Sequence, residues 1–516
     1  MRRLRGGTFW GLVAGLIWLL PALPLAAQTP QMSPQDIAPS WLSDTIAPRS
    51  PDVAAEIVTE DIRVMPIGPI TRNAVGLLAA RVTGFPSGLW GQSDSAELAG
   101  LFRRLPMTGP PAILDLTERL ALSELDPPLG GTDAAADDLF LARIDMLLAR
   151  GALEPARALI ERAGVEDGEV FRRWFDVSLL LGQADRACAA MRASPDIAPT
   201  YPARIFCLAR SGDWSAAALS MGTGVALGFI TEEEADLIAR FLDPELFEGE
   251  PPLPLDPDIT PLRYVMRAAI AERPSSLGLP LAFAHADLAA QAGWRAQLDA
   301  AERLLRAGAI EPSQWLAIAT SRRPSASGGI WERVAAVQEF DASLLAGDVA
   351  AIARSLARVV DALGPTGLLP AFAQLYADPL GRQPLVGEAA ILARKIELLS
   401  RNYESLALRA VPQSADEAVA FALARGKMPN LPATASPRVM ALAAGFDEIA
   451  LPDRYAPLIT GNRAGEALLL AALTLSGDGA DLDDLSDALL VLRYLGLEDS
   501  ARRAALQLYL LPDRNG

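Results

Sequence analysis

Residues suited to acid–base, nucleophilic or metal chemistry are sparse in this sequence. His285 is the single histidine, which excludes sites with several histidine ligands and leaves any serine-type triad dependent on this one residue. It falls in residues 282–290, a stretch of helical composition, so we expect a partly buried or solvated histidine on a helix. No G-x-S-x-G, S-x-x-K, H-E-x-x-H or phosphate-binding G-x-x-x-x-G-K motif occurs. The sequence therefore predicts no catalytic residue, no metal ligand and no cofactor.

One dipeptide leaves an enzymatic alternative open. Soluble lytic transglycosylases combine an α-superhelix with a lysozyme-like domain whose acid is a glutamate followed by serine, and Glu404-Ser405 resembles that pair. The Gly-Leu-Met-Gln and Ala-Tyr-Asn runs expected after it are absent. Such an acid also needs an apolar pocket that raises its pKa. The resemblance implies peptidoglycan cleavage by Glu404 as an alternative function.

Two other patterns that suggest a ligand have simpler structural interpretations. An acidic cluster lacks the oxygen spacing and closing glutamate of a calcium loop, so it predicts a charged helix start; it consists of Asp478, Asp481, Asp483, Asp484 and Asp487. Gly222, Gly224 and Gly228 miss the dinucleotide-binding spacing by one residue. We expect a loop there.

Cys188 and Cys207 are the only cysteines. Residues 169–193 read as two helices joined at Gly182, and residues 202–210 begin the next helical hairpin, so antiparallel packing can bring the thiols together. Closing such a loop stabilises the fold by about 3 kcal/mol in the chain-entropy description. We expect a structural disulfide, with two buried free thiols as the alternative. Neither arrangement implies redox catalysis, because no Cys-x-x-Cys is present.

The N-terminus has the pattern of a secretory signal peptide. Arginines precede an apolar stretch, residues 9–25, that two prolines interrupt, and the small residues before Gln28 suit cleavage after Ala27. An uncleaved anchor is the alternative, but a spanning helix needs about 20 apolar residues. We expect residues 1–27 to be removed and the mature chain to be periplasmic, without a transmembrane segment.

Composition and charge limit the partners of the mature chain. The sequence has 516 residues, 51% of them hydrophobic, which suffices for a large core. Loss of three arginines with the signal lowers the basic count from 46 to 43 against 63 acidic residues, so the net charge falls from −17 to −20. We therefore expect no nucleic-acid partner, because phosphate backbones favour clustered positive charge.

Glycine-centred turns recur between helical segments. Gly151, Gly182 and Gly212 are 31 and 30 residues apart, and similar turns occur at Gly293, Gly347 and Gly496. Glycine adopts the left-handed conformation that ends a helix, and a neighbouring acidic residue favours the start of the next. Apolar residues between the turns have helical spacing, as in Val334, Val337, Phe340 and Leu344 and in Leu485, Leu489, Leu492 and Leu495. The pattern predicts an all-α protein.

These hairpins resemble the tetratricopeptide superfamily, whose repeat is a pair of antiparallel helices of about 34 residues. The resemblance is clearest over residues 147–219. Trp331, Val334 and Ala335 match the opening of the family signature, whereas Gln338 and Gly347 replace its aromatic residue and its alanine. The resemblance implies an irregular helix-turn-helix solenoid; a compact helical bundle is the alternative.

Proline-rich segments suggest the domain boundaries. Residues 28–70 are expected to form a linker or extended arm, with Trp41 as its one bulky anchor and a short extended piece at 61–70. Helical-repeat regions are predicted at 71–247 and 262–516, separated by a proline-rich linker at 248–261. A second break at 364–384 is expected to bend the C-terminal region.

The function expected from these features is that of an exported, non-enzymatic scaffold or adaptor that binds another protein of the cell envelope. Helical solenoids present long concave surfaces to peptides and partner domains. A small-molecule binding protein is a further alternative. Neither the partner nor the oligomeric state follows from the sequence.

Overall fold

The computed structural model describes residues 39–43, 72–131, 137–254, 258–477 and 481–511. These ranges contain 25 α-helices, and their only β pairing consists of the isolated bridges Leu78–Ser123 and Asp94–Gly130. The prediction of an all-α protein is confirmed. The predicted signal peptide, the extended piece at 61–70 and most of the arm lie outside the described residues.

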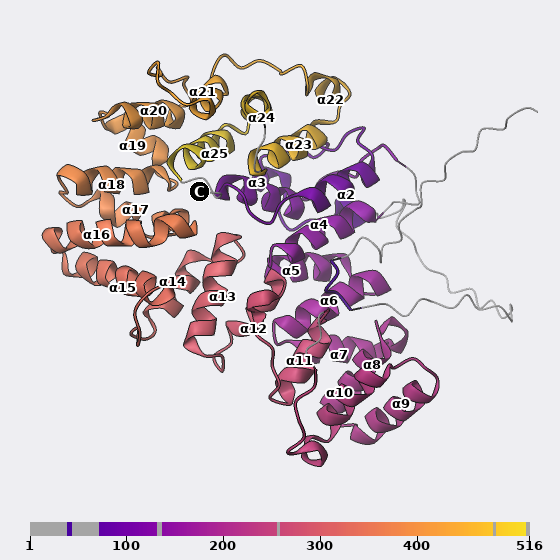
Figure 1. Cartoon of the computed structure of the whole chain (residues 1–516). Helices are drawn as coiled ribbons and strands as arrows, with labels where there is room; N and C mark the ends of the chain where they lie inside the picture. The colour runs from indigo at the N-terminus through magenta and orange to yellow at the C-terminus, as the bar shows by residue number, and fades with distance from the viewer. Residues whose placement is uncertain (1–38, 44–71, 132–136, 255–257, 478–480, 512–516) are drawn as a thin grey trace, which may run out of the picture.

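The first ten helices run from the N-terminal side of the array to its lower lobe in Figure 1. They are α1 (Ala80–Thr83), α2 (Ser95–Arg104), α3 (Pro111–Leu122), α4 (Asp138–Ala149), α5 (Leu153–Ala163), α6 (Gly168–Leu180), α7 (Ala184–Ala193), α8 (Tyr201–Arg210), α9 (Trp214–Ala226) and α10 (Glu232–Leu242). Short 3-10 helices lie beside them at η1 (Arg72–Ala74), η3 (Pro195–Ile197) and η4 (Pro244–Phe247).

The remaining helices lead back to the starting point. They are α11 (Pro261–Ala269), α12 (Ala284–Asp287), α13 (Trp294–Arg306), α14 (Pro312–Thr320), α15 (Ile330–Ala346), α16 (Val349–Leu363), α17 (Leu369–Gly381), α18 (Gly387–Leu398), α19 (Tyr403–Arg409), α20 (Ala415–Ala424), α21 (Pro437–Ala444), α22 (Ala456–Thr460), α23 (Ala464–Ser476), α24 (Leu482–Tyr494) and α25 (Glu498–Leu510). The 3-10 helices in this part are η5 (Ser276–Gly278), η6 (Leu281–Phe283) and η7 (Gly364–Thr366).

Most of the predicted glycine turns have the expected backbone. Gly151, Gly182 and Gly212 have φ values of 74°, 72° and 85°, each in the left-handed region that favours glycine. Gly347 ends α15 in the same conformation, and the Asp348 side chain then caps α16. At Gly293 the prediction was wrong, because its φ is −62° and it precedes α13 as the N-cap residue.

Two segments expected to lack helix are helical. The predicted loop at Gly222 and Gly224 lies inside α9, where Gly224 allows the helix to approach Ile230 closely. The predicted break at 364–384 contains α17, a helix with Pro370 in its first turn, where no helical hydrogen bond is lost, and Pro379 inside it, where one is lost. Its apolar face is buried at Leu369, Phe372, Ala373, Tyr376, Ala377 and Leu380.

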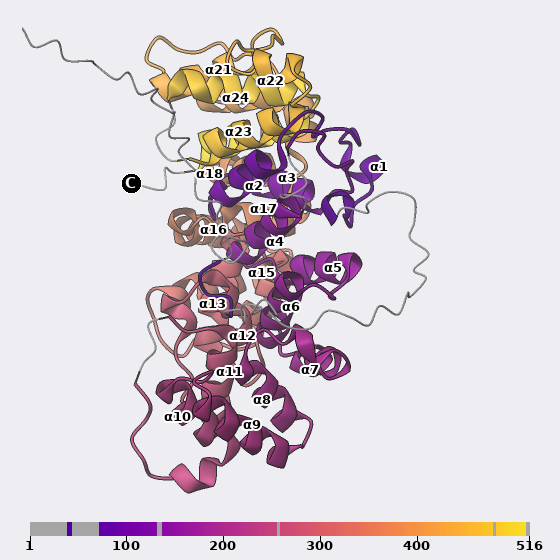
Figure 2. The same ribbon diagram turned by 90° about the vertical axis from the view of Figure 1, so that its right-hand side faces the viewer.

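The two ends of the helical array pack against each other. Figures 1 and 2 both place the C-terminal helices beside the N-terminal ones, with α23 on α2 and α3, and α25 on α3. Trp90 is 1% exposed at this junction, and a Cβ on Gly465 would lie 2.4 Å from its ring. The Gln507 side chain accepts a 2.8 Å hydrogen bond from the Ala112 amide, across 395 residues of sequence. The described helices therefore follow a closed path.

The buried hydrophobic residues form two large clusters, and the boundary between these clusters does not fall at the proline-rich segment 248–261. One cluster joins helices on both sides of the proline-rich segment 248–261 with the C-terminal helices α19–α25, and a second is formed mainly by α13–α18. Helices α10 and α11 pack directly against each other across that segment. Among the helices of the described ranges, none combines the length and apolar character required to cross a bilayer.

The junction predicts opposite effects for two glycine-to-alanine substitutions in helices. Gly465→Ala should lower the free energy of unfolding by about 1–3 kcal/mol, because the new methyl group overlaps the Trp90 ring. Gly222→Ala meets no atom within 4 Å and should raise it by about 0.5–1 kcal/mol through helix propensity. Urea denaturation followed by circular dichroism compares the two, and equal effects would contradict this packing.

Candidate functional site

Residues 40–43 occupy a groove between α6 and η6. Trp41 is 7% exposed and packs edge-on against Phe283, with ring centroids 5.8 Å apart. Both polar groups of the Ser43 main chain are bound: its amide donates to Asp176 Oδ2 at 2.7 Å, and its carbonyl accepts from Arg172 Nη1 at 2.9 Å. Residues 39–42 form a turn, in which the Leu42 amide donates to the Pro39 carbonyl at 3.0 Å. The groove therefore holds this turn through one aromatic side chain and the Ser43 backbone.

One face of α6 supplies the charges of this groove. Glu169, Arg172, Arg173 and Asp176 follow one another at intervals of three, one and three residues, so they share a helix face. Arg173 binds Asp145 of α4 at 2.7 and 3.1 Å and Glu169 at 2.9 Å. The network fixes the orientation of α6 against α4, and thereby the position of Asp176.

Burial raises the pKa of Asp176 to about 7. The hydrogen bonds from the Ser43 amide and hydroxyl favour the ionised carboxylate and oppose this effect, as do the charges of Arg172 and Arg173. Asp176 therefore titrates near neutrality while it is in contact with the docked segment.

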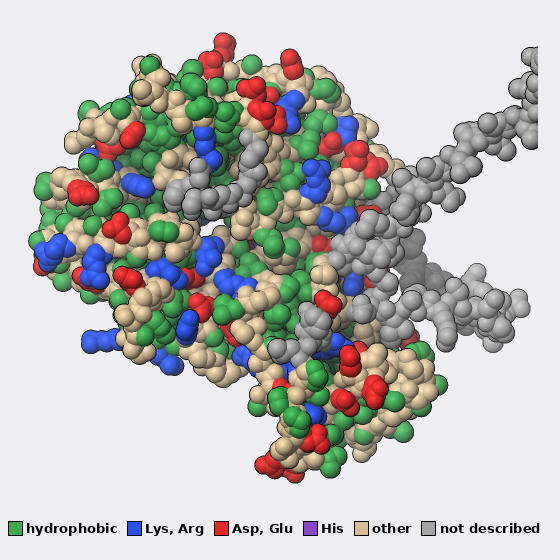
Figure 3. Space-filling model, in the orientation of Figure 1, with side chains coloured by type: hydrophobic (Ala, Val, Ile, Leu, Met, Phe, Trp, Pro, Cys, Tyr) green, Lys and Arg blue, Asp and Glu red, His purple; other side chains and the backbone are tan. Residues whose placement is uncertain are grey.

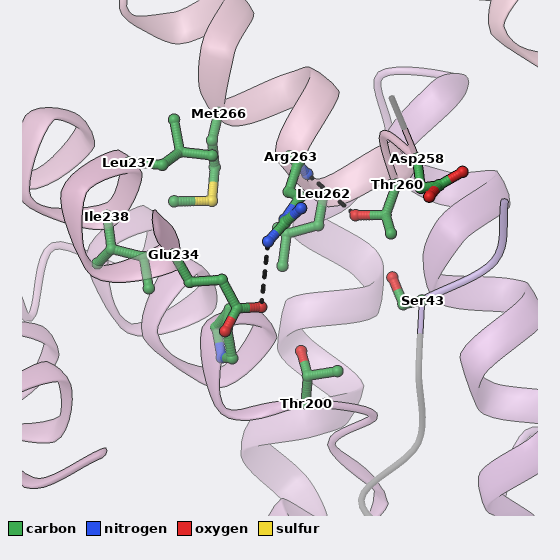
Figure 4. Close-up of a pocket in the computed structure, with 11 residues that line it drawn as sticks. Ser43, Thr200, Glu234, Leu237, Ile238, Asp258, Thr260, Leu262, Arg263 and Met266 are labelled. Atoms are coloured by element: carbon green, nitrogen blue, oxygen red, sulfur yellow. Dashed lines mark hydrogen bonds and ion pairs between the residues drawn. The ribbon is translucent and has the colours of Figure 1, made fainter. Parts of the chain in front are cut away.

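A pocket of about 230 Å³ continues from Ser43 between α8, α10 and α11 (Figure 4). Its floor is apolar and consists of Leu237, Ile238, Leu262 and Met266. Glu234 and Arg263 form a 3.8 Å ion pair on its rim. A volume of about 150 Å³ already accommodates a benzene ring, so this pocket is large enough for one bulky side chain.

The two cysteines predicted to form a disulfide are bonded to each other in the structure. Cys188 of α7 and Cys207 of α8 form a disulfide, with Cα atoms 5.0 Å apart. Thr200 and Pro202, at the start of α8, line the pocket. The disulfide therefore ties α7 to the helix that forms one wall of the pocket.

Other residues considered from the sequence lie elsewhere. The His285 Nε2 is 2.5 Å from the Gly151 carbonyl oxygen, and burial lowers the pKa of the imidazole. Because a carbonyl oxygen only accepts, Nε2 carries the proton, and the histidine links α12 to the turn after α4.

The Glu404 side chain is 54% exposed and bound to Arg502 at 2.9 Å, surroundings that differ from the apolar pocket of a general acid. Asp481 caps α24, as expected of a charged helix start.

The buried charges around Ser43 do not follow from the sequence, which indicates Trp41 as an anchor but gives no role to Asp176 or Arg172. The available signal was the clustering of four charged side chains on one face of a helix predicted within a buried repeat.

The comparisons with known proteins assign no family to the chain. No family model matches it, and neither a curated protein nor a solved structure is significantly similar to it. Within the described residues, no group of three or more histidine, cysteine, aspartate or glutamate side chains is placed to hold a metal ion.

The docked segment predicts unequal effects for two tryptophan substitutions. Trp41→Ala should lower the free energy of unfolding by about 3 kcal/mol, because it empties a buried aromatic site. Trp214, a residue that is 51% exposed, provides the control, and Trp214→Ala should change the free energy of unfolding by less than about 0.5 kcal/mol. Chemical denaturation measures both, and a silent Trp41→Ala variant would show that residues 40–43 do not dock.

The raised pKa of Asp176 predicts a pH-dependent cost to stability. Between the unfolded pKa of 3.8 and the folded pKa of about 7, the folded state retains a proton that the unfolded state has lost. The contribution of Asp176 to stability therefore falls as pH rises through this window, by as much as about 4 kcal/mol at 1.36 kcal/mol per pKa unit.

Asp176→Asn removes this titration. The free energy of unfolding of the native protein minus that of the variant should decrease from pH 4 to pH 7 and then level off, as measured by urea denaturation at each pH. A difference independent of pH would contradict the assignment.

Proposed function

We propose that this protein is an exported, non-enzymatic helical-repeat adaptor of the cell envelope that binds a short segment of a partner protein. The observation that carries the proposal is the pocket of about 230 Å³ that continues from the docked residue Ser43. The Asp176 and Arg172 side chains already bind the Ser43 backbone, so the adjoining pocket is the part of this site that a partner side chain can enter.

The pocket beside Ser43 supplies the subsite for the partner. Its apolar floor favours a large aliphatic or aromatic side chain, and the Glu234–Arg263 pair on its rim provides polar groups to the backbone around that side chain. We infer that a partner segment passes over α10 and α11 with such a residue inserted. The Glu404 carboxylate offers no comparable binding geometry.

The proposal includes the cellular location of the protein and its helical-repeat architecture. A basic and then apolar N-terminus supports export, and the Cys188–Cys207 disulfide is compatible with an oxidising compartment. Hairpins such as α8–α9 and α15–α16, which turn at glycines in the left-handed conformation, support a divergent tetratricopeptide-like array. The strongly acidic chain favours basic partner segments.

Site-specific photocross-linking in the producing cells tests this function. A benzophenone amino acid replaces Glu234 on the pocket rim in one variant and Glu233, exposed on the same helix, in the control. The Glu234 position should give an adduct with one envelope protein, and peptide mapping should locate the adduct in one short segment of it. The mature chain in the periplasmic fraction should begin at Gln28.

Two outcomes would contradict the proposal. Equal adducts from the two positions would indicate nonspecific contact, and absence of any adduct at the Glu234 position would remove the partner-binding role from this pocket. Retention of the full chain in the cytoplasm would overturn the envelope assignment separately.

A further inference from the structure

A second cavity lies where the closed path of helices meets itself, away from the groove. It has a volume of about 150 Å³ and is walled by α3, α25, the turn between α13 and α14, the start of α17 and the turn before α19. A more open hollow of about 330 Å³ shares Asp115, Arg401 and Arg503 with it. Figure 3 shows an opening near the middle of this face, with basic side chains around it.

Arginines from three distant parts of the chain line this cavity. Arg503 of α25 lies 3.3 Å from Asp115 and 3.7 Å from Asp499, and Arg306 of α13 lies 3.9 Å from Glu302. Arg401 lines both hollows and forms no hydrogen bond or ion pair with the residues that the structure describes. In a chain of net charge −17, this convergence leaves one guanidinium free to receive an anion.

Glu118 of α3 lines the same cavity without a hydrogen bond to any described residue. Burial raises the pKa of its carboxyl to about 7; Arg150 opposes the shift, whereas Asp115 and Glu311 add to it. A large part of Glu118 is therefore protonated near neutrality, and its O–H can donate to an oxygen of a ligand. Protonation also removes a negative charge that would repel an anion.

The rest of the wall is mixed: Glu311 and Gln374 also line it, beside an apolar part. Leu114, Leu305 and Ile310 face the cavity from α3, α13 and the following turn, together with Pro312 and Pro370. The volume is close to that of a cavity that holds one benzene molecule, about six non-hydrogen atoms. A ligand of this size with both a hydrocarbon part and an oxyanion matches the wall.

We propose that this cavity binds a small organic carboxylate, whose oxygens are received by Arg401 and Arg503 and whose hydrocarbon part lies against Leu114, Leu305 and Ile310. Guanidinium groups bind carboxylates through paired N–H donors, which fixes the orientation of the ligand. The protonated Glu118 donates to the same ligand. This site is independent of the peptide groove, and its failure would leave the proposed function intact.

Isothermal titration calorimetry of the mature protein with butyrate and acetate tests the proposal, with sulfate as an anion that lacks a hydrocarbon part. Butyrate, which has one carboxylate and about six non-hydrogen atoms, should bind saturably at about pH 7. Arg401→Gln should weaken binding by about tenfold or more. Arg323→Gln is the matched control, because Arg323 is an exposed arginine between α14 and α15 that lines neither hollow, and it should leave the affinity unchanged.

The pH dependence tests the role of Glu118. Since an anion favours the protonated carboxyl, affinity should rise as pH falls, by up to about tenfold between pH 8 and pH 6. Glu118→Gln, which shares any titration of the ligand itself, should lose this dependence and keep binding.

Three results would overturn the carboxylate site. They are absence of saturable binding by either carboxylate, retention of native affinity in Arg401→Gln, and sulfate binding as tight as butyrate binding. Circular dichroism of each variant confirms that it is folded before its affinity is compared.

Discussion

The contact between the first and last helices determines the shape of everything between them. The Ala112 amide lies in the first turn of α3, where it has no partner within its own helix, and the Gln507 side chain of α25 satisfies it. Gly465 admits the Trp90 ring at the neighbouring contact. Because interiors are close-packed, these contacts fix the path of the intervening helices, and the central cavity exists only when that path is closed.

Buried charge imposes the second constraint. Leaving a carboxylate such as Asp176 in an apolar interior is costly unless hydrogen bonds and opposite charges offset the loss of water. Ser43 and Arg172 provide them, so the segment around Trp41 completes the interior of the helical lobe. The same logic applies at Arg143, whose buried guanidinium donates to four backbone carbonyls around α3 and η1. Where neighbouring residues leave a buried polar group without a hydrogen-bond partner, a segment distant in the sequence supplies that partner.

Patterns with a short range predicted much of the local structure. Glycines 30 or 31 residues apart predicted helix ends because the left-handed conformation is a property of one residue, and the apolar spacing of residues 334–344 predicted a buried helix face. The disulfide followed because its cysteines lie in adjacent hairpins. Proline was misleading in α17, where a buried apolar face outweighs weak helix propensity. Glycine was misleading in α9, where Gly224 lies inside the helix at its close contact with Ile230.

The two candidate sites could not be predicted because their partners are far apart in the sequence. Asp176 meets Ser43 across 133 residues, and the cavity joins Glu118 of α3 to Arg503 of α25. Sequence periodicity does not predict such pairings, because they are determined by how the helices pack. A ligand that contacts α3, α13 and α25 at once binds only the closed arrangement, so its binding free energy adds to the contacts between Gln507 and Ala112 and between Trp90 and Gly465. The helical array and its central cavity are therefore thermodynamically linked, whereas the groove around Trp41 depends on α6 and its neighbours within one lobe.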